Sequence, residues 1–499
     1  MTADAPAIVW FRDDLRLADQ PALHAAAESG RPLICIYILD DGTDGVRPPG
    51  GASRWWLHHS LTALAESFAR IGGRLDVLRG RPLVLLRQLA SASSAASVFW
   101  TRRYAPAERE ADAAIKAALQ ADGVEVRSFN GQLLFEPWTV KGKSGDFLKV
   151  FTPFWRAALN GPPPALPLPA PKSLKTAKWP AKGPARVDIG DLGLLPSKPD
   201  WAGGLRAAWT PGEAGARQRF DYFLDSGLRR YASDRDRPDV EATSRLSPHL
   251  RFGEISPRQI FHAVRHLSEA DGATGRDAEK FLSEVGWREF SYNLLFHAPD
   301  LTRRNFQTRF DAFPWGEPSA KLLDAWRRGR TGYPIVDAGM RELWITGFMH
   351  NRVRMIAASF LIKHLMIDWR TGEEWFWDTL CDADPANNPA GWQWVAGSGA
   401  DAAPYFRVFN PILQGEKFDP DGAYVRTYVP ELAKLPTKWI HKPWIAPPDV
   451  RKAAGLASSK TYPSPIVDHD TARQRALAAF ASLRETSTTE SDARSHSRV

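Results

Sequence analysis

The sequence predicts an α/β N-terminal domain with a parallel five-stranded sheet, joined by a long connector to an all-helical domain. Three observations support this prediction. Short apolar runs alternate with helical patterns over residues 1–130, a proline-rich stretch occupies residues 161–201, and strand patterns nearly disappear beyond Gly212. Strands that alternate with helices imply parallel βαβ units with right-handed crossovers.

The N-terminal domain is expected over residues 5–134. Its strands are short, largely β-branched or aromatic, and bounded by glycine, proline or charge. The five expected strands are Ile8–Phe11, Leu33–Leu39, Arg74–Leu78, Ser97–Thr101 and Val124–Phe129. Between them, residues 52–71 place leucine and phenylalanine on one helical face, and residues 107–121 are rich in helix formers. No G-x-G-x-x-G follows the first strand, which argues against a nicotinamide enzyme.

The connector is expected over residues 135–205, because its prolines cannot continue a helix or a central strand. The helical domain is expected over residues 206–485. Its expected helices are Ala214–Phe223, Pro257–Leu267, Asp277–Phe296, Lys321–Arg328, Asp337–Thr346 and Asn351–Ile367. Residues 486–499 lack apolar anchors, and we predict a disordered tail there.

Composition limits the class of protein. With 65 basic and 57 acidic residues the net charge is +8, which permits binding to a polyanion without requiring it. Only two cysteines occur, Cys35 and Cys381, so neither a disulfide framework nor a zinc site is expected. Neither a signal-peptide pattern nor an apolar run of bilayer-spanning length is visible, so we expect a soluble, cytoplasmic protein.

Two segments combine charged, amide and aromatic residues: D-A-D-P-A-N-N-P-A-G-W-Q-W at 382–394 and T-G-F-M-H-N-R-V-R-M at 346–355. Buried charges and amides need partners, and indoles beside such groups suit a large planar cofactor. A third segment, residues 230–250, brings Thr243, Ser244 and Ser247 together just before a helix. That arrangement suits a phosphate, and it is equally typical of an ordinary helix cap.

The segment F-L-S-E-V-G-W-R-E-F at 281–290 places Glu284 and Trp287 on one helix face. A carboxylate beside an indole can bond the edge of a base and stack on its plane. A core tryptophan beside a surface glutamate is the alternative interpretation. Asn351 and Met355 lie one helical turn apart and also share a face.

Together with W-F-R-D-D-L-R-L-A-D-Q-P-A-L at 10–23, these segments resemble the DNA photolyase and cryptochrome family. The chain is similar to a class I-type cyclobutane pyrimidine dimer photolyase from Trp10 to about Leu483. The resemblance implies a deoxyribodipyrimidine photo-lyase, which splits dimers in DNA by electron transfer from excited FADH⁻. A dimer flipped out of the duplex is a property of that family. The alternative is a cryptochrome-type blue-light receptor without repair activity.

The resemblance also implies site residues. Those that bind FAD are Tyr231, Thr243, Ser244, Arg245, Leu246, Ser247, Arg354, Asp382, Ala383, Asp384 and Asn388. Those of the catalytic lesion pocket are Glu284, Trp287, Asn351, Met355 and Trp394. Electron transfer to the flavin is assigned to Trp392, Trp369 and Trp315. DNA contacts are assigned to Arg235, Glu284, Trp287, Arg288, Asn351, Arg352 and Arg407.

The resemblance also bears on the substrate and the cofactor state. Enzymes that act on (6-4) photoproducts carry histidines at the positions of Asn351 and Met355, so cyclobutane dimers are the expected substrate. Asn388 occupies the position that faces the flavin N5, and an asparagine there favours the fully reduced anionic flavin.

The antenna chromophore is less well defined by the sequence. R-R-Y-A-P-A-E-R keeps Glu108 but has Ala107 where folate-binding relatives often carry asparagine. Methenyltetrahydrofolate is the expected antenna, with 8-hydroxy-5-deazaflavin or no antenna as alternatives. UV-damaged DNA is the expected partner of a monomer that needs neither a membrane nor a protein partner, and no metal site is expected.

Overall fold

The computed structural model describes residues 5–317, 319–401, 406–458 and 460–496, with the side chains of residues 273 and 484–496 left out. Two compact units are present. The first comprises Met1–Ala232, Thr243–Pro299 and Cys381–Asp384, and the second comprises Ser233–Ala242, Asp300–Leu380 and Pro385–Val499. The units therefore do not follow the expected boundary at residue 205, because the first helices of the helical region pack with the α/β domain.

The first unit contains a five-stranded parallel sheet in the order β3-β2-β1-β4-β5, as predicted. The strands are β1 (Ala7–Phe11), β2 (Leu33–Leu39), β3 (Leu75–Arg79), β4 (Ser97–Thr101) and β5 (Glu125–Phe129). Val9 of the central strand pairs with Cys35 on one side and Phe99 on the other. Short apolar runs predicted these strands well, because a strand covered on both faces is apolar throughout.

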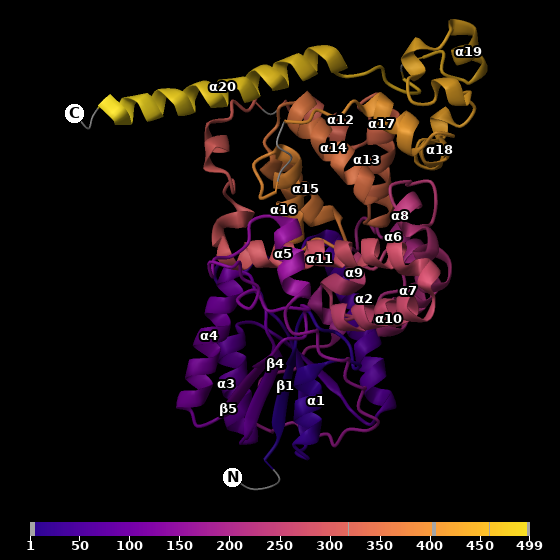
Figure 1. Cartoon of the computed structure of the whole chain (residues 1–499). Coiled ribbons are helices and arrows are strands. Elements are labelled where there is room, and N and C mark those ends of the chain that lie inside the picture. Colours follow the sequence, from indigo (N-terminus) through magenta and orange to yellow (C-terminus); the bar gives the residue numbers. More distant parts are fainter. Residues whose placement is uncertain (1–4, 318, 402–405, 459, 497–499) are drawn as a thin grey trace. The chain divides into compact units, whose positions relative to one another are not determined.

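Helices cover both faces of this sheet (Figure 1). They are α1 (Pro21–Glu28), α2 (Gly51–Arg70), α3 (Pro82–Ser93) and α4 (Pro106–Ala121). Ile8 and Trp10 of β1 share a core with side chains of α3 and α4. Phe11 points to the other face, where its ring centroid lies 5.4 Å from that of Phe68 in α2. This alternation follows from the two-residue period of a strand.

The same unit also contains helices from the connector and from the helical region. They are α5 (Phe151–Leu159), α6 (Gly203–Ala208), α7 (Glu213–Tyr222), α9 (Ser247–Arg251), α10 (Pro257–Ala270) and α11 (Gly275–His297). α8 (Tyr231–Asp234) begins in this unit and ends in the other. A second hydrophobic core joins α7, α10 and α11 through residues such as Phe220, Ile260 and Phe281.

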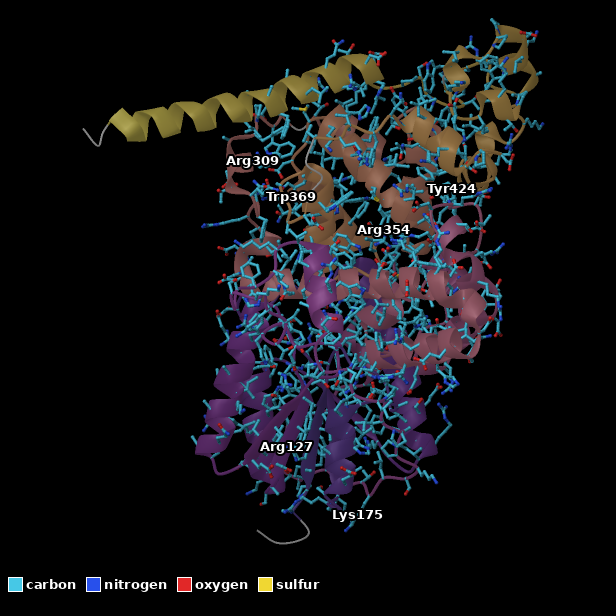
Figure 2. All side chains as sticks on the ribbon, in the orientation of Figure 1. Arg127, Lys175, Arg309, Arg354, Trp369 and Tyr424 are labelled. Carbon is cyan, nitrogen blue, oxygen red and sulfur yellow. The ribbon has the colours of Figure 1, made fainter. Side chains whose placement is uncertain are left out.

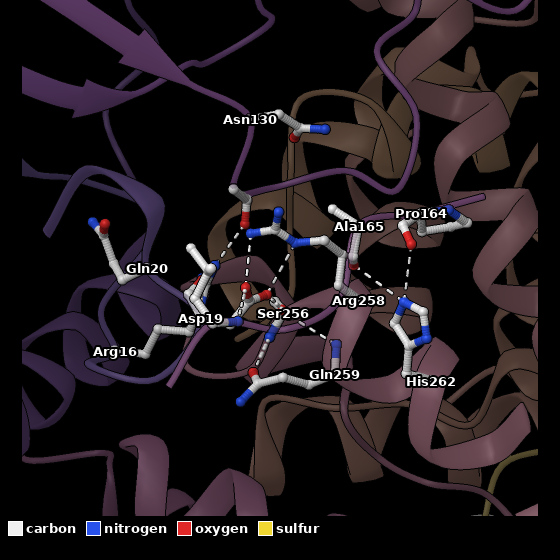
Figure 3. A network of polar contacts seen from close by, with 12 residues as sticks. Arg16, Asp19, Gln20, Asn130, Pro164, Ala165, Ser256, Arg258, Gln259 and His262 are labelled. Carbon is white, nitrogen blue, oxygen red and sulfur yellow. Dashed lines mark hydrogen bonds and ion pairs between the residues drawn. The ribbon is translucent and has the colours of Figure 1, made fainter. Parts of the chain in front are cut away.

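Asp19 connects the sheet to these helices (Figure 3). Its buried carboxylate accepts hydrogen bonds from Ser256 Oγ at 2.5 Å and from Arg258 Nε at 3.0 Å. It also accepts from the backbone N–H of Leu168 at 3.0 Å. Arg16 donates to the backbone oxygens of Asp19 and Gly253. Strand end, connector and helix are thus joined by one buried polar network.

Within its described part the second unit is helical. Its α-helices are α12 (Ala320–Arg327), α13 (Pro334–Thr346), α14 (Asn351–Ser359), α15 (Trp369–Thr379), α16 (Asn387–Ala396), α17 (Pro411–Phe418), α18 (Ala423–Tyr428), α19 (Pro448–Ala453) and α20 (His469–His496). The expected helix over 351–367 is interrupted, because α14 continues into a π-helical turn at Phe360–His364.

The predicted disordered tail also differs from the structure. The backbone of α20 continues to His496, and residues 497–499 lie outside the described part. Buried Ala472, Ala476 and Leu483 anchor the beginning of α20, and a helix that has started can propagate through the residues that follow.

None of the helices within the described ranges is both long and apolar enough to cross a bilayer.

Candidate active site

A partly exposed indole and a carboxylate share one face of α11 in the first unit. The Trp287 ring stacks on Phe151, with centroids 4.0 Å apart and planes 9° from parallel. Glu284, three residues earlier, lies 3.0 Å from Lys280 Nζ. Both side chains are half-buried rather than part of the core. Because Phe151 holds the indole in place, α11 presents a preorganised flat surface next to a hydrogen-bonding group.

Arg288 lies beside them in sequence but points into the protein. It is 9% exposed, and its Nη1 donates to the carbonyl oxygen of Gln132 at 2.8 Å. Its neighbour Glu289 accepts from the backbone N–H groups of Leu134 and Phe135, and burial raises the pKa of Glu289 to about 7. This geometry gives Arg288 a structural partner and little access to a phosphate.

The hydroxyl-bearing loop at 243–247 also belongs to the first unit. Arg245 adopts a left-handed conformation with φ of 51°, and its guanidinium lies 4.5 Å from the centre of the Trp209 ring. Leu246 is buried and Ser247 begins α9. Ser247 Oγ donates to Asp382 Oδ2 at 2.5 Å, so the loop contacts the 382–384 segment directly.

The 382–384 segment is buried in the same unit. Asp382, Ala383 and Asp384 are all inaccessible, and Arg251 Nε donates to the carbonyl oxygen of Ala383 at 2.8 Å. Tyr231 is buried as well, with its ring edge-on to those of Phe223 and Phe281. The structure therefore brings together three of the predicted cofactor segments within one unit.

In the second unit, His350 is the N-cap residue of α14. Its Nδ1 accepts from the backbone N–H of Arg352 at 3.2 Å, and burial lowers the pKa of His350 to about 4. The imidazole is therefore neutral, with its proton on Nε2. A hydrogen bond between the ring and the backbone of Arg235 opposes this lowering of the pKa. Asn351 is exposed, and Met355 is partly exposed one turn later on the same helix.

The arginines of this unit have partners. Arg354 Nε donates to the carbonyl oxygen of Met349 at 2.6 Å, and its guanidinium lies 5.2 Å from the ring of Phe348. Arg352 Nη2 donates to Asp236 Oδ2 at 2.8 Å, and Arg235 Nε lies 3.9 Å from the same carboxylate. Arg407 is exposed. Figure 2 labels Arg354 together with Trp369, the central tryptophan of the predicted chain.

The α16 segment carries Asn388, Trp392 and Trp394. Asn388 Nδ2 donates to the carbonyl oxygen of Glu373 at 3.1 Å and to its Oε1 at 2.7 Å. Both amide hydrogens are used, so the oxygen of Asn388 is what this side chain can offer to another group. Trp394 is partly exposed, and its Nε1 donates to the carbonyl oxygen of Asp401 at 3.2 Å.

The three predicted electron-transfer tryptophans all lie in the second unit. Trp392 is 3% exposed and packs edge-on to Phe376, with ring centroids 4.9 Å apart. Its ring also covers Gly372, where a Cβ would lie 2.1 Å from it. Gly372 lies three residues after Trp369 in α15. Trp315 is partly exposed and packs on Phe313, so accessibility increases toward this residue.

Three polar residues of this site escaped the sequence reasoning. Gln393 lies between two indoles and Glu373 lies on α15, and both are buried. Asn305 is buried too, and its Oδ1 accepts from Trp369 Nε1 at 2.9 Å. The sequence W-Q-W at 392–394 could have indicated a buried, hydrogen-bonded Gln393, because the residues on both sides of it are apolar rings. Asn305 carries no local signal.

Glu108, the predicted antenna residue, lies in the first turn of α4. Its Oε1 is 3.2 Å from Arg103 Nη1, and both side chains are largely buried. Burial raises the pKa of Glu108, and the nearby Arg103 opposes that shift.

The donor chemistry fits a flavin nucleotide. The first unit offers hydroxyls, a backbone loop and two buried carboxylates, which suit ribityl and phosphate groups. Separately, the second unit carries Arg354 and the amide oxygen of Asn388, which the family resemblance assigns to the same cofactor.

Comparison with known proteins gives matches over nearly the whole chain. Residues 7–172 match the family model described as DNA photolyase, and residues 281–482 match the FAD binding domain of DNA photolyase. The deoxyribodipyrimidine photo-lyase of Agrobacterium fabrum is 55% identical over 97% of this chain and 99% of the relative. Cryptochrome-1 of Arabidopsis thaliana is 39% identical over 95% of this chain and 70% of the relative.

Among solved structures, a class III photolyase from Agrobacterium tumefaciens aligns with a TM-score of 0.92 and 54% identity, covering 97% of this chain and 99% of that one. The photolyase resemblance and the fold predicted from the sequence are thereby confirmed. The class I subtype is not confirmed, because this similar structure is described as class III.

Proposed function

Because this chain belongs to the DNA photolyase and cryptochrome family, we propose that it is an FAD-dependent photo-lyase that splits cyclobutane pyrimidine dimers in DNA with light. The observation that carries this proposal is the pair on α11. Trp287, braced by Phe151 at 4.0 Å, and Glu284 beside it offer a stacking surface and a hydrogen-bond acceptor for a pyrimidine. A light receptor without repair activity does not need such a pair.

The lesion would be held by groups of complementary chemistry. Trp287 would stack on a flipped pyrimidine, and Glu284 would bond its edge. The family resemblance assigns Trp394 to the lining around the lesion. The exposed amide of Asn351 can donate to a pyrimidine carbonyl, while Met355 gives a soft apolar contact. Neither residue can transfer a proton as a histidine does. This supports dimers rather than (6-4) photoproducts as the substrate.

We assign the flavin to Tyr231, the 243–247 loop and Asp382–Asp384, which lie together in the first unit. The family resemblance also assigns Arg354 and Asn388 to this cofactor. When bound in its fully reduced anionic form, FAD would supply one electron to the dimer under light and regain it after ring splitting. Asn388 supports this form, because its amide hydrogens are held by Glu373 and only its oxygen is available to accept a proton donor such as a reduced ring nitrogen.

Trp392, Trp369 and Trp315 would deliver electrons to the flavin from the surface. Their accessibility supports this order, since Trp392 and Trp369 are buried and Trp315 is partly exposed. DNA would be bound through Arg235, Arg352 and exposed Arg407, in line with the net charge of +8. Arg288 is better suited to the structural role that its buried contact with Gln132 indicates.

The test compares two variants in two assays. Trp392→Phe should lose light-driven reduction of oxidised FAD, while its chemically reduced form still repairs thymine dimers. Glu284→Ala should photoreduce normally and repair poorly, because its role depends on a bound lesion. An oligonucleotide with a (6-4) photoproduct serves as the control substrate and should remain unrepaired.

Two results would overturn the proposal. Repair of (6-4) photoproducts with dimers untouched would refute the substrate assignment. Normal flavin photoreduction without any dimer repair in the wild-type protein would favour the cryptochrome-type receptor instead.

For the antenna we keep methenyltetrahydrofolate as the prediction, with 8-hydroxy-5-deazaflavin or no antenna as alternatives. Glu108 would have to exchange its ion pair with Arg103 for a contact with the chromophore. The absorption spectrum of the purified protein, together with chromophore extraction, distinguishes the three.

A further inference from the structure

Trp369, a buried indole of the predicted electron-transfer chain, has a hydrogen-bond acceptor. Its Nε1 donates to Asn305 Oδ1 at 2.9 Å, and both side chains are inaccessible at 0% and 4% exposure. Asn305 Nδ2 in turn donates to Asp311 Oδ1 at 2.7 Å. Asp311 is exposed, so the amide connects the buried indole to a carboxylate at the surface.

The loop that carries Asn305 is fixed by Gln393. The buried Gln393 Nε2 donates to the carbonyl oxygens of Leu301 at 2.7 Å and Arg304 at 2.9 Å. Its Oε1 accepts from the backbone N–H of Phe306 at 2.8 Å. These three hydrogen bonds of Gln393 hold the backbone on both sides of Asn305, so the position of the acceptor does not depend on a mobile surface side chain.

Trp392 is different. Its Nε1 is buried, and no acceptor lies within hydrogen-bonding distance among the residues that the structure describes. When an indole loses an electron its N–H becomes a much stronger donor, and a hydrogen bond to a charged donor is roughly twice as strong as a neutral one. An acceptor therefore favours the oxidised state of Trp369 over that of Trp392.

The positive charge of Arg370 disfavours the oxidised state of Trp369, but a neighbouring carboxylate pairs with that charge. The Arg370 guanidinium lies 4.7 Å from the centre of the Trp369 ring. Arg370 Nη1 also lies 2.8 Å from Asp368 Oδ2, so this charge is paired. Asp311, at the end of the Asn305 chain, has no cation within salt-bridge distance among the described residues.

We propose that Asn305 is a positioning residue that directs electron transfer through the tryptophan chain, an inference that rests on the proposed function. Trp369 gives one electron to the oxidised Trp392, which becomes neutral again, and Trp369 becomes a radical cation. Its N–H proton stays on nitrogen, because the amide oxygen of Asn305 accepts a hydrogen bond without taking the proton. The positive charge can then move on to Trp315 rather than being trapped by deprotonation.

Two substitutions separate the parts of this role. Asn305→Leu keeps the size and removes the acceptor, so the quantum yield of flavin photoreduction should fall about tenfold, the equilibrium equivalent of one charge-assisted hydrogen bond. Asn305→Asp keeps an acceptor that can also take the proton. Flash spectroscopy should then show the neutral Trp369 radical instead of the cation, and less oxidised Trp315.

Gln307→Leu is the matched control. Gln307 lies on the same loop and its Nε2 donates to the carbonyl oxygen of Gly399 at 2.8 Å, away from Trp369. This variant should photoreduce like the wild type. In a Trp369→Phe background, Asn305→Leu should have no further effect on photoreduction, which a general loss of folding would not reproduce.

A readout in the dark checks the contact itself. In NMR spectra of isotope-labelled holoprotein, Asn305→Leu should shift the one indole N–H resonance that is missing from Trp369→Phe. If the wild type photoreduces and Asn305→Leu does so at the same yield, the inference is refuted while the proposed function stands. If the wild-type protein binds no flavin or does not photoreduce at all, the proposed function fails, and this inference with it.

Discussion

Asp19 tests whether one buried charge holds the α/β domain to the helices that follow it (Figure 3). Its carboxylate is fully inaccessible, and Arg258 Nη2 lies 2.9 Å from Oδ1. Ser256 and the backbone of Leu168 are its other donors. Asp19→Asn removes the charge with little change in size. Its left-handed φ of 51° is also tolerated by asparagine, so no backbone strain is added.

The expected magnitude follows from the geometry. Arg258 is itself buried, so the substitution leaves a guanidinium without its counter-ion in a region of low polarity. Removing one partner of a buried ion pair costs about 3–5 kcal/mol. The exposed pair Arg206–Asp200, 2.7 Å apart, is the control, and Asp200→Asn should leave the free energy of unfolding nearly unchanged.

Urea unfolding followed by circular dichroism measures both variants, with the midpoint and slope compared to the wild type. The double variant Asp19→Asn/Arg258→Met should recover most of the lost stability, since the uncompensated charge is removed. Equal, small losses in Asp19→Asn and Asp200→Asn would refute the reasoning.

Three further predictions concern other parts of the protein. Burial lowers the pKa of Lys363 from 10.5 to about 7. Between these two pH values the unfolded chain carries a proton on Lys363 that the folded chain lacks. The free energy of unfolding of the wild type therefore falls as the pH drops from about 10.5 to 7. Lys363→Met should therefore be more stable than the wild type at pH 7 by at most about 5 kcal/mol, and it should lose that advantage near pH 10.5. Urea unfolding at both pH values measures the difference. A gain in stability that does not depend on pH would show that the Lys363 charge is not its cause. Gly372→Ala should abolish flavin photoreduction and lower stability by about 1–3 kcal/mol, because the added methyl group would lie 2.1 Å from the Trp392 ring. Unchanged photoreduction would show that the Trp392 ring can move aside. Arg235→Ala should weaken binding of damaged and undamaged DNA alike and reduce the salt slope by about one, as measured by fluorescence anisotropy; a loss confined to damaged DNA would instead make Arg235 a lesion contact.

Local patterns were sufficient for the sheet and for much of the helical region. Leu33–Leu39 and Ser97–Thr101 are strands with the predicted bounds, because each is an apolar run bounded by residues that end strands. The helix expected at 277–296 is α11, and Glu284 and Trp287 share its face because residues three apart on a helix are neighbours. Resemblance, in turn, identified the family, since its motifs are contiguous in the sequence.

The interruption at Phe360–His364 and the continuation of α20 were not predictable in this way. A π-helical turn depends on how the residues around it pack, and Asn351–Ile367 has the periodicity of an ordinary helix. Likewise the first turns of α20 are anchored by side chains such as Ala476, which share a core with Phe310 and Phe406. Neither contact leaves a signal in the neighbouring residues.

By itself, the sequence determined the strands of the sheet, several of the longer helices, the family and the residue types at the site, because periodicity and motifs act over a few residues. Only the tertiary structure decided which polar groups are paired. It placed Arg288 on the Gln132 carbonyl rather than at the surface, gave both amide hydrogens of Asn388 to Glu373, and set Asn305 against Trp369 across 64 residues of sequence. Such pairs form because packing buries both groups at the same place, and a buried group must find its partner there however far away that partner is in the chain.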